Sequence, residues 1–330
     1  MVCHRRGAHV LLLGILSTAL SILHVTSAMA ADAPVDFSQR LDSLWTFSDP
    51  AQSEQRFRHE LAKHAAGSRE ALETTTQIAR TQSLRRLFRE ADATLDTIVA
   101  ALAHAPARIR VRYLLECGRT LNSAGKAAQA VALFIQATQV TDGDPGAAFY
   151  QVDALHMLGL AAPKAEQLDW NRRALAIADA SSDARTRERW GASLNHNIGW
   201  TYFERGEPKT ALVHWTKALA LRETMDDAQA LHVARWTVAR GYRELGRLDE
   251  ADAIQRSLAA QSERANMPDG YVYEELAEIA VARSDAAGAR PLAAKAHALL
   301  QNDRSLAGDE AARRARLTRL AELGGVAVAQ

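Results

Sequence analysis

Small and apolar residues recur along this chain in pairs of helix-length segments that are separated by a short turn. In the clearest pair, Gly199 is followed by the aromatic Tyr202, four residues later by Gly206 and five residues after that by Ala211. The segment from Val238 to Leu258 repeats these offsets. Glycine readily takes the left-handed conformation that ends a helix. The pattern therefore predicts two helices joined by a glycine turn.

Three further segments carry the same pattern and begin at Ile78, Cys117 and Leu276. In the first and the last of them, Arg86 and Ser284 stand where the turn glycine is expected. The alanine of the second helix marks each copy: Ala91, Ala130, Ala211, Ala251 and Ala289. A repeat at a fixed period is typical of a solenoid, in which each unit buries its apolar face against its neighbours.

The marker alanines lie about 40 residues apart, except for one interval of about twice that length. We expect a degenerate unit there, from Ala147 to Ala180, with Pro163 in its turn. This unit brings the predicted number to about six. Within each unit, a small residue such as Gly118 or Gly199 is expected where the two helices approach most closely, and Phe134 or Trp215 is expected to fill the gap to the next unit.

The pattern resembles the tetratricopeptide repeat over roughly Leu72 to Leu300, although its period exceeds the family's usual length of about 34 residues. The resemblance implies an all-α fold, a right-handed α-solenoid of about six helix-turn-helix repeats with helical caps. We therefore divide the chain into residues 1–30, a signal peptide; 31–71, a linker with capping helices; 72–300, the repeat array; and 301–330, a capping helix and tail.

The first thirty residues have the layout of a secretory signal peptide. Arg5 and Arg6 precede an apolar run from Val10 to Val25, and Ala28-Met29-Ala30 matches a small-residue cleavage site. An uncleaved membrane anchor is the alternative, but the run is shorter than the roughly 20 residues that a spanning helix needs. We expect cleavage between Ala30 and Ala31, a periplasmic or secreted protein of the exported bacterial type, and no stable membrane insertion after cleavage.

The flanking segments are expected to cap the array. Asp49 and Pro50 form a helix start, because an acceptor side chain precedes a proline, and the helix from Pro50 to His64 would place Phe57 on its packed face. The segment from Asp309 to Leu323 predicts a basic amphipathic helix. Its arginines are expected to form the solvated face of a cap; a membrane or acidic-partner site is the alternative.

Composition narrows the function further. The formal net charge of +1 argues against a nucleic-acid partner, since such proteins usually carry a basic excess. Beyond the signal region only Cys117 remains, and it is expected to be a buried, unreactive thiol. His59 and His64 are five residues apart on a helix, so they cannot share one metal ion. We find no catalytic motif and expect no enzyme activity, no metal and no cofactor.

The resemblance implies that the first helix of each unit lines a concave groove. The residues expected on that groove are Arg80, Arg119, Asn122, His196, Trp200, Phe203, Trp236, Arg240, Arg243, Tyr271, Glu274 and Glu278. Tryptophan beside arginine is typical of interface hot spots, although both tryptophans could instead fill the core between units. The stripe is rich in arginine at first and acidic in the last unit, and this gradient would orient an extended ligand. His196 and Trp200 occupy positions where chaperone-binding relatives carry carboxylate-holding side chains, so that ligand is not implied.

These observations predict an exported scaffold that binds a protein or peptide through its groove. One alternative is a cell-wall-acting enzyme with a helical solenoid, but the repeats occupy nearly all of the chain. The other is a cytoplasmic regulator, if the apparent signal peptide is not one.

Overall fold

The computed structural model describes residues 36–140, 145–303 and 310–326. These ranges form fifteen α-helices and one 3-10 helix, and no strand occurs within them. The predicted signal peptide and its cleavage site lie outside the described residues. None of the described helices is both long enough and apolar enough to span a bilayer.

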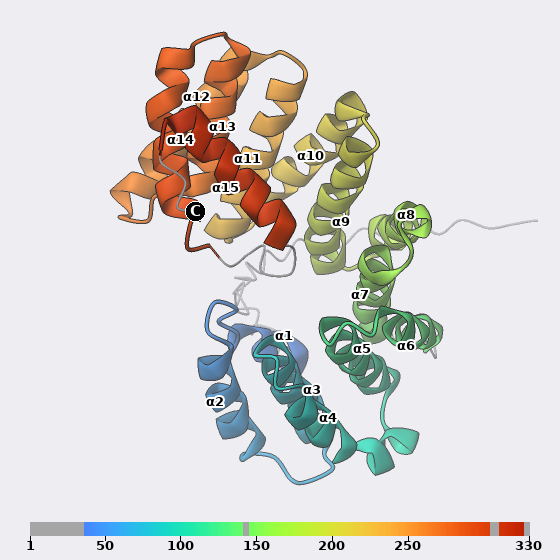
Figure 1. Ribbon diagram of the computed structural model, residues 1–330. Helices are drawn as coiled ribbons and strands as arrows, with labels where there is room; N and C mark the ends of the chain where they lie inside the picture. The colour runs from blue at the N-terminus through green and yellow to red at the C-terminus, as the bar shows by residue number, and fades with distance from the viewer. Residues whose placement is uncertain (1–35, 141–144, 304–309, 327–330) are drawn as a thin grey trace, which may run out of the picture.

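Twelve of the helices form six consecutive pairs, which lie side by side in chain order (Figure 1). Their bounds are α3 Arg69–Leu84 and α4 Phe88–Asp96; α5 Ala107–Ser123 and α6 Ala127–Gln139; α7 Pro145–Ala161 and α8 Lys164–Ala180; α9 Ala184–Glu204 and α10 Pro208–Arg222; α11 Ala228–Glu244 and α12 Leu248–Arg264; α13 Gly270–Ala282 and α14 Ala286–Leu300. We number these pairs units 1 to 6. The predicted all-α repeat architecture is confirmed.

The same backbone hydrogen bond closes the turn of every unit except the third. In unit 2 the Lys126 amide donates to the Leu121 carbonyl at 2.9 Å, and Gly125 between them has a φ of +79°. Equivalent bonds join Leu87 to Gln82, Glu207 to Tyr202, Arg247 to Tyr242 and Asp285 to Ala280. This is the pattern of a helix that ends on a left-handed residue. Arg86 and Ser284 take positive φ values of 62° and 60° where glycine is missing.

The turn between the two helices of unit 3 has a different backbone conformation. Pro163 is the N-cap of α8 and is extended, with ψ of 140°, so no left-handed residue is needed. The Asn171 side chain of α8 lies against Gly159 of α7 and donates to its carbonyl at 3.3 Å. An amide thus takes the place that an aromatic ring holds in units 2 and 4, and this explains why the unit is hard to recognise in the sequence.

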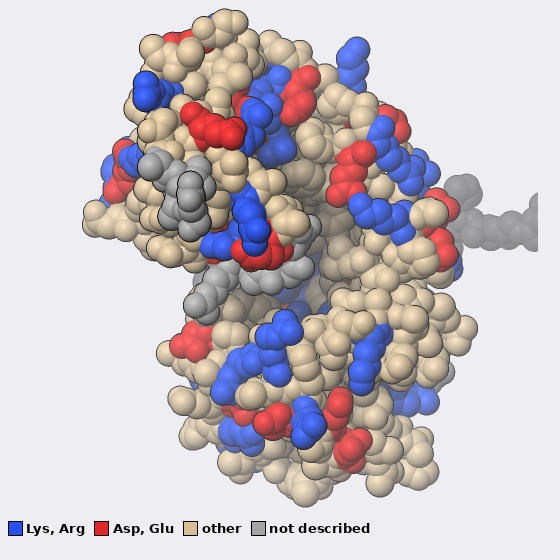
Figure 2. Space-filling view, viewed as in Figure 1, with Lys and Arg blue, Asp and Glu red and all other residues tan. Residues whose placement is uncertain are grey.

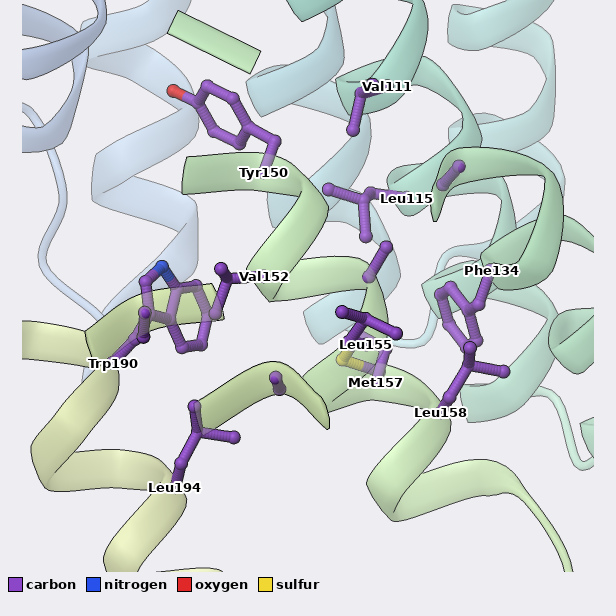
Figure 3. Packing of buried hydrophobic residues seen from close by; sticks show 14 of the residues in the cluster. Val111, Leu115, Phe134, Tyr150, Val152, Leu155, Met157, Leu158, Trp190 and Leu194 are labelled. Carbon is purple, nitrogen blue, oxygen red and sulfur yellow. The ribbon is translucent and has the colours of Figure 1, made fainter. Parts of the chain in front are cut away.

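The two helices of a unit pack most closely at the small residues that the sequence predicted for this role. A β-carbon at Gly118 would overlap the Phe134 ring, and one at Gly199 would overlap Trp215, so these rings pack first on the glycine of their own unit. Trp215 also contacts the next unit, since its ring lies 3.2 Å from a β-carbon built at Gly241, closer than an ordinary contact. Figure 3 shows the largest cluster, in which side chains of α5 to α9 interdigitate around Leu155 and Leu158.

Two helices precede the array and one follows it. Helix α2 (Pro50–Leu61) packs on α3 and begins as predicted, with the Asp49 side chain accepting from the Gln52 amide at 3.0 Å. It ends three residues earlier than predicted, because tighter turns bond Lys63 and His64 to carbonyls three residues before them. Helix α15 (Glu310–Gly324) packs on α14, and its arginines also reach α13. Helix α1 (Phe37–Ser43) is placed differently and is described below.

Candidate functional site: the inner face

The first helices of the units, α3, α5, α7, α9, α11 and α13, share one side of the array, which we call the inner face. Successive first helices exchange side-chain contacts there: Arg80 with Glu116 at 3.6 Å, Arg119 with Asp153, and Arg240 with Glu275 at 2.9 Å. The array bends, and a hollow lies between its N-terminal and C-terminal units (Figures 1 and 2). The inner face borders this hollow.

All twelve predicted groove residues lie on first helices. The structure brings seven of them together on α9, α11 and the start of α13: His196, Trp200, Phe203, Trp236, Arg240, Arg243 and Tyr271. Arg80 and Arg119 belong to a second group near the N-terminal end, with Asn122 one turn beyond Arg119. Glu274 and Glu278 both pair with α15.

The first group is centred on Arg240. Its guanidinium carbon lies 5.8 Å from the Trp200 ring, 5.3 Å from the Phe203 ring and 5.6 Å from the Trp236 ring. We call these three rings and Arg240 the tryptophan cluster. A guanidinium over aromatic faces is attracted by the ring quadrupole, and the bond to Glu275 fixes its position.

The two tryptophans of this cluster pack between units and remain half-buried. Their rings are stacked at 6.4 Å. The Trp200 indole donates to His196 Nε2 at 3.0 Å, and the Trp236 indole donates to the Tyr271 carbonyl at 3.1 Å. Burial lowers the pKa of His196 to about 4, with a smaller contribution from the charge of Arg222, so this ring is a neutral acceptor at pH 7. Trp200 and Trp236 thus fill space between units, and their role in binding a partner stays a prediction.

A hollow of about 760 Å³ lies between α9 and α11, and His196 connects its lining to Trp200 of the cluster. His196, Asn197 and Val233 border it, and Phe47 reaches it from the segment between α1 and α2. Val233 and Phe47 are among the exposed large apolar side chains of the described chain. The hollow therefore offers apolar surface, amide groups and the guanidinium of Arg222.

The acidic end predicted for the groove is compensated by arginines. Glu275 is buried and accepts from both Arg240 and Arg243, at 2.9 and 2.7 Å. Glu274 pairs with Arg316 at 3.1 Å and Glu278 with Arg319 at 2.8 Å. Two of the arginines expected to be solvated on α15 therefore neutralise α13, and most of the predicted charge gradient disappears.

The second group surrounds a cavity of about 200 Å³ at the N-terminal end of the inner face. Arg80, Arg112, Arg119 and Arg189 line it, and we call it the arginine cavity. Arg119 donates to Glu116 at 2.6 Å and to both oxygens of Asp153 at 2.5 and 2.6 Å. Burial alone would raise the pKa of Asp153, but the charges of Arg119 and Arg80 hold it below its usual value.

Several residues of the arginine cavity were not predicted. Tyr150, Asp153 and His156 come from α7, whose unit has no recognisable turn motif, although their spacing of three residues places them on one helical face. Trp45 and Phe47 lie in the segment assigned as a linker; their rings stack at 4.7 Å, and Arg80 lies within 5.7 Å of both. Burial lowers the pKa of His156 to about 4. In the described ranges, no three His, Cys, Asp or Glu side chains are grouped to hold a metal ion.

No protein-family model matches the sequence, and no curated protein matches it. Several solved structures, however, are similar to this chain. The apo form of RapI is similar with a TM-score of 0.58 and 11% identity, over 88% of this chain and 82% of that one. PilW, a type IV pilus biogenesis factor, is similar with a TM-score of 0.51 and 18% identity, over 72% and 97%. BtubC from P. vanneervenii has a TM-score of 0.50 and 16% identity, over 68% and 92%. These likenesses show the fold, a tetratricopeptide-type array.

Proposed function

We propose that this protein is an exported scaffold that binds a segment of another protein in the hollow beside the tryptophan cluster. The observation that carries the proposal is the hollow of about 760 Å³, whose lining residue His196 accepts from Trp200 of the cluster in which Glu275 and three aromatic rings hold Arg240. Large aromatic surfaces and forked arginine donors dominate protein interfaces.

The fixed geometry favours binding. Trp200 and Trp236 are stacked, and each indole N–H already has an acceptor, so these side chains lose little freedom when a partner covers them. Pre-organised surfaces bind more tightly because less conformational entropy is lost on association. Val233 and Phe47, which line the hollow and are exposed, supply the apolar contact area.

The export part of the proposal rests on the sequence of the first thirty residues. Fractionation of the native host followed by N-terminal sequencing tests it. A mature chain that starts at Ala31 in the exported fraction is the expected result. A full-length chain in the cytoplasm would contradict export and would favour the cytoplasmic regulator.

Binding is tested by capture of partners with matched surface variants. Val233 is 39% exposed and borders the hollow, whereas Val213 is 55% exposed on α10, a second helix. We expect Val233→Glu to lose partners that the wild-type chain captures from the exported fraction, and Val213→Glu to keep them. Equal partner sets for all three proteins, with unchanged circular dichroism, would refute the assignment of this surface.

A further inference from the structure

Helix α1 does not extend the array at its end but lies across the inner face. The segment around it contacts first helices of three units beyond α3. The Ser38 hydroxyl bonds to Tyr150 of α7 and accepts from Arg112 of α5 at 3.1 Å. Asp42 pairs with Arg185 and Arg189 of α9, with the latter at 3.5 Å. A helix that merely continued the stack would contact its immediate neighbours.

The contacts that hold this segment over the inner face are mostly polar and charged. Asp36, just before α1, accepts from Arg108 of α5 with both oxygens at 3.0 Å. Four arginines of α5 and α9 therefore point at the segment: Arg108, Arg112, Arg185 and Arg189. In Figure 3 the Tyr150 hydroxyl, the partner of Ser38, points away from the apolar cluster. The surface beneath α1 thus accepts carboxylate and hydroxyl groups.

The apolar attachment of α1 lies on a different surface, formed by α2 and α3. Of its seven residues only Ser38 and Leu41 are buried, and Leu41 packs against α2 and α3 outside the surface formed by α5, α7 and α9. The carboxylates of Asp36 and Asp42 are 47% and 31% exposed, and ion pairs at such exposure contribute little stability each. A competitor with the same charges can therefore replace the contacts to α5, α7 and α9, and displacement of α1 also separates Leu41 from Phe57 and Ile78.

We propose that the inner face of units 2 to 4 is a binding surface for a short helical segment of a partner protein with two carboxylates about six residues apart, and that α1 occupies this surface until such a segment displaces it. The spacing is that of Asp36 and Asp42, and the charge is complementary to Arg108, Arg185 and Arg189, whereas Arg112 is already paired with Glu73 at 2.8 Å. Displacement also uncovers the arginine cavity, since Asp42 and Trp45 line it. The surface lies apart from the tryptophan cluster, although Phe47 and His156 line both the arginine cavity and the hollow, and it rests on the proposed function in that the partner is a protein.

The test uses the full chain and a fluorescent synthetic peptide of residues 36–48 as the probe. In the wild-type chain the tethered α1 competes with the probe, because a short link keeps its effective concentration high. Asp42→Arg repels Arg185 and Arg189 and frees the surface. We expect the probe to bind the Asp42→Arg chain at least tenfold more tightly than wild type, with affinity that falls as salt is added.

Two controls keep the proposal falsifiable. A probe with Asp36→Asn and Asp42→Asn should bind the Asp42→Arg chain at least tenfold more weakly. A chain with Asp42→Arg, Arg185→Asp and Arg189→Asp should restore the ion pairs between α1 and α9 and bind neither probe. Equal binding of the two probes, or equal binding to wild type and Asp42→Arg, would show that α1 is a permanent cap and would overturn the proposal. If Asp42→Arg loses its helical circular dichroism, Asp42→Asn replaces it in the same comparisons.

Hydrogen exchange in the wild-type chain gives a second readout. An unrelated alanine-based helix with two aspartates six residues apart should accelerate exchange of the amides of α1, and the same helix with two asparagines should not. Unchanged exchange with the acidic helix at saturating concentration would overturn the proposal. A concentration-dependent dimer in which α1 exchanges between copies would also overturn it, since the occupant would then be a second copy. These outcomes are independent of the Val233 capture experiment.

Discussion

The Trp215 indole lies against the backbone of Gly199, where a β-carbon would overlap ring atoms Cδ1 and Nε1. Trp215 is 1% exposed, and its indole N–H donates to the His196 carbonyl at 3.2 Å, so the ring cannot shift without losing a buried bond. The helices of unit 4 can approach this closely only because residue 199 has no side chain.

Gly199→Ala is expected to destabilise the protein. Overpacking of a core costs about 1–3 kcal/mol, which outweighs the gain of about 1 kcal/mol in helix propensity. Urea unfolding measures the change, and Gly199→Ala with Trp215→Phe should recover part of it, because the smaller ring leaves room. A Gly199→Ala protein as stable as wild type would contradict the packing described for unit 4.

Ser284→Gly is expected to stabilise the last unit. Ser284 has a φ of 60°, and a side chain in the left-handed region costs about 1–2 kcal/mol, whereas glycine adopts it freely at some entropic cost. A net gain of about 1 kcal/mol in the free energy of unfolding should follow. The reciprocal change Gly246→Ser, at a φ of 73°, should lose a similar amount. Changes of the same sign for both variants would refute this account of the turns.

Glu275→Gln is expected to be strongly destabilising. The carboxylate is 1% exposed and is the partner of both Arg240 and Arg243, so its neutralisation removes the ion pair of Arg240 and leaves Arg243 with Glu244 alone. Breaking a buried pair costs about 3–5 kcal/mol. Glu278→Gln serves as the control, because its partner Arg319 is 57% exposed and such pairs contribute at most about 1 kcal/mol. Equal losses of unfolding free energy for the two variants in urea would show that the ion pairs of Glu275 contribute no more than an exposed pair.

Stability is expected to fall as the pH is lowered from about 6.5 to about 4. Burial holds the pKa of both His156 and His196 at about 4, against an ordinary value of 6.5. The unfolded chain therefore binds more protons than the folded chain in this window, and the free energy of unfolding rises with pH. Thermal unfolding should show a smaller pH slope for His196→Gln and a smaller one still when His156→Gln is added. An unchanged slope in the double variant would refute the assignment of this pH dependence to His156 and His196.

Cys117 is expected to resist alkylation in the folded protein. Burial raises the pKa of its thiol to about 12, and only the thiolate is nucleophilic. In a Cys3→Ser chain at pH 8, iodoacetamide should modify Cys117 about a thousandfold more slowly before urea unfolding than after it. Mass spectrometry of timed samples measures both rates. Similar rates in the two states would show that the thiol is accessible and ionised.

Much of the fold could be predicted because each helix-turn-helix unit has a local sequence signature. The turn residue, the small residue before it and the alanine of the second helix lie within one unit, and each has a local geometric reason. The third unit was hard to recognise because Pro163 forms its turn in place of glycine, and because Asn171 packs on its glycine in place of an aromatic ring. Likewise, the residues on the first helices could be named, because helical spacing assigns a side chain to a face.

The partners of those residues could not be predicted. Arg240, Glu275 and the three rings around Arg240 come from α9, α11 and α13, and nothing local in the sequence says which arginine compensates which carboxylate. The sequence suggested an acidic end of the groove, and the structure neutralised it with Arg316 and Arg319 of α15.

The sequence by itself thus determined the repeat, its turns and the side chains that each first helix presents, since these depend on the spacing of residues within a unit. Only the tertiary structure decided that α1 lies across the inner face and that Asp42 meets Arg189 of α9. That contact depends on how far the stacked units bend. The bend is the sum of small rotations between neighbouring units, and packing across all of them sets it.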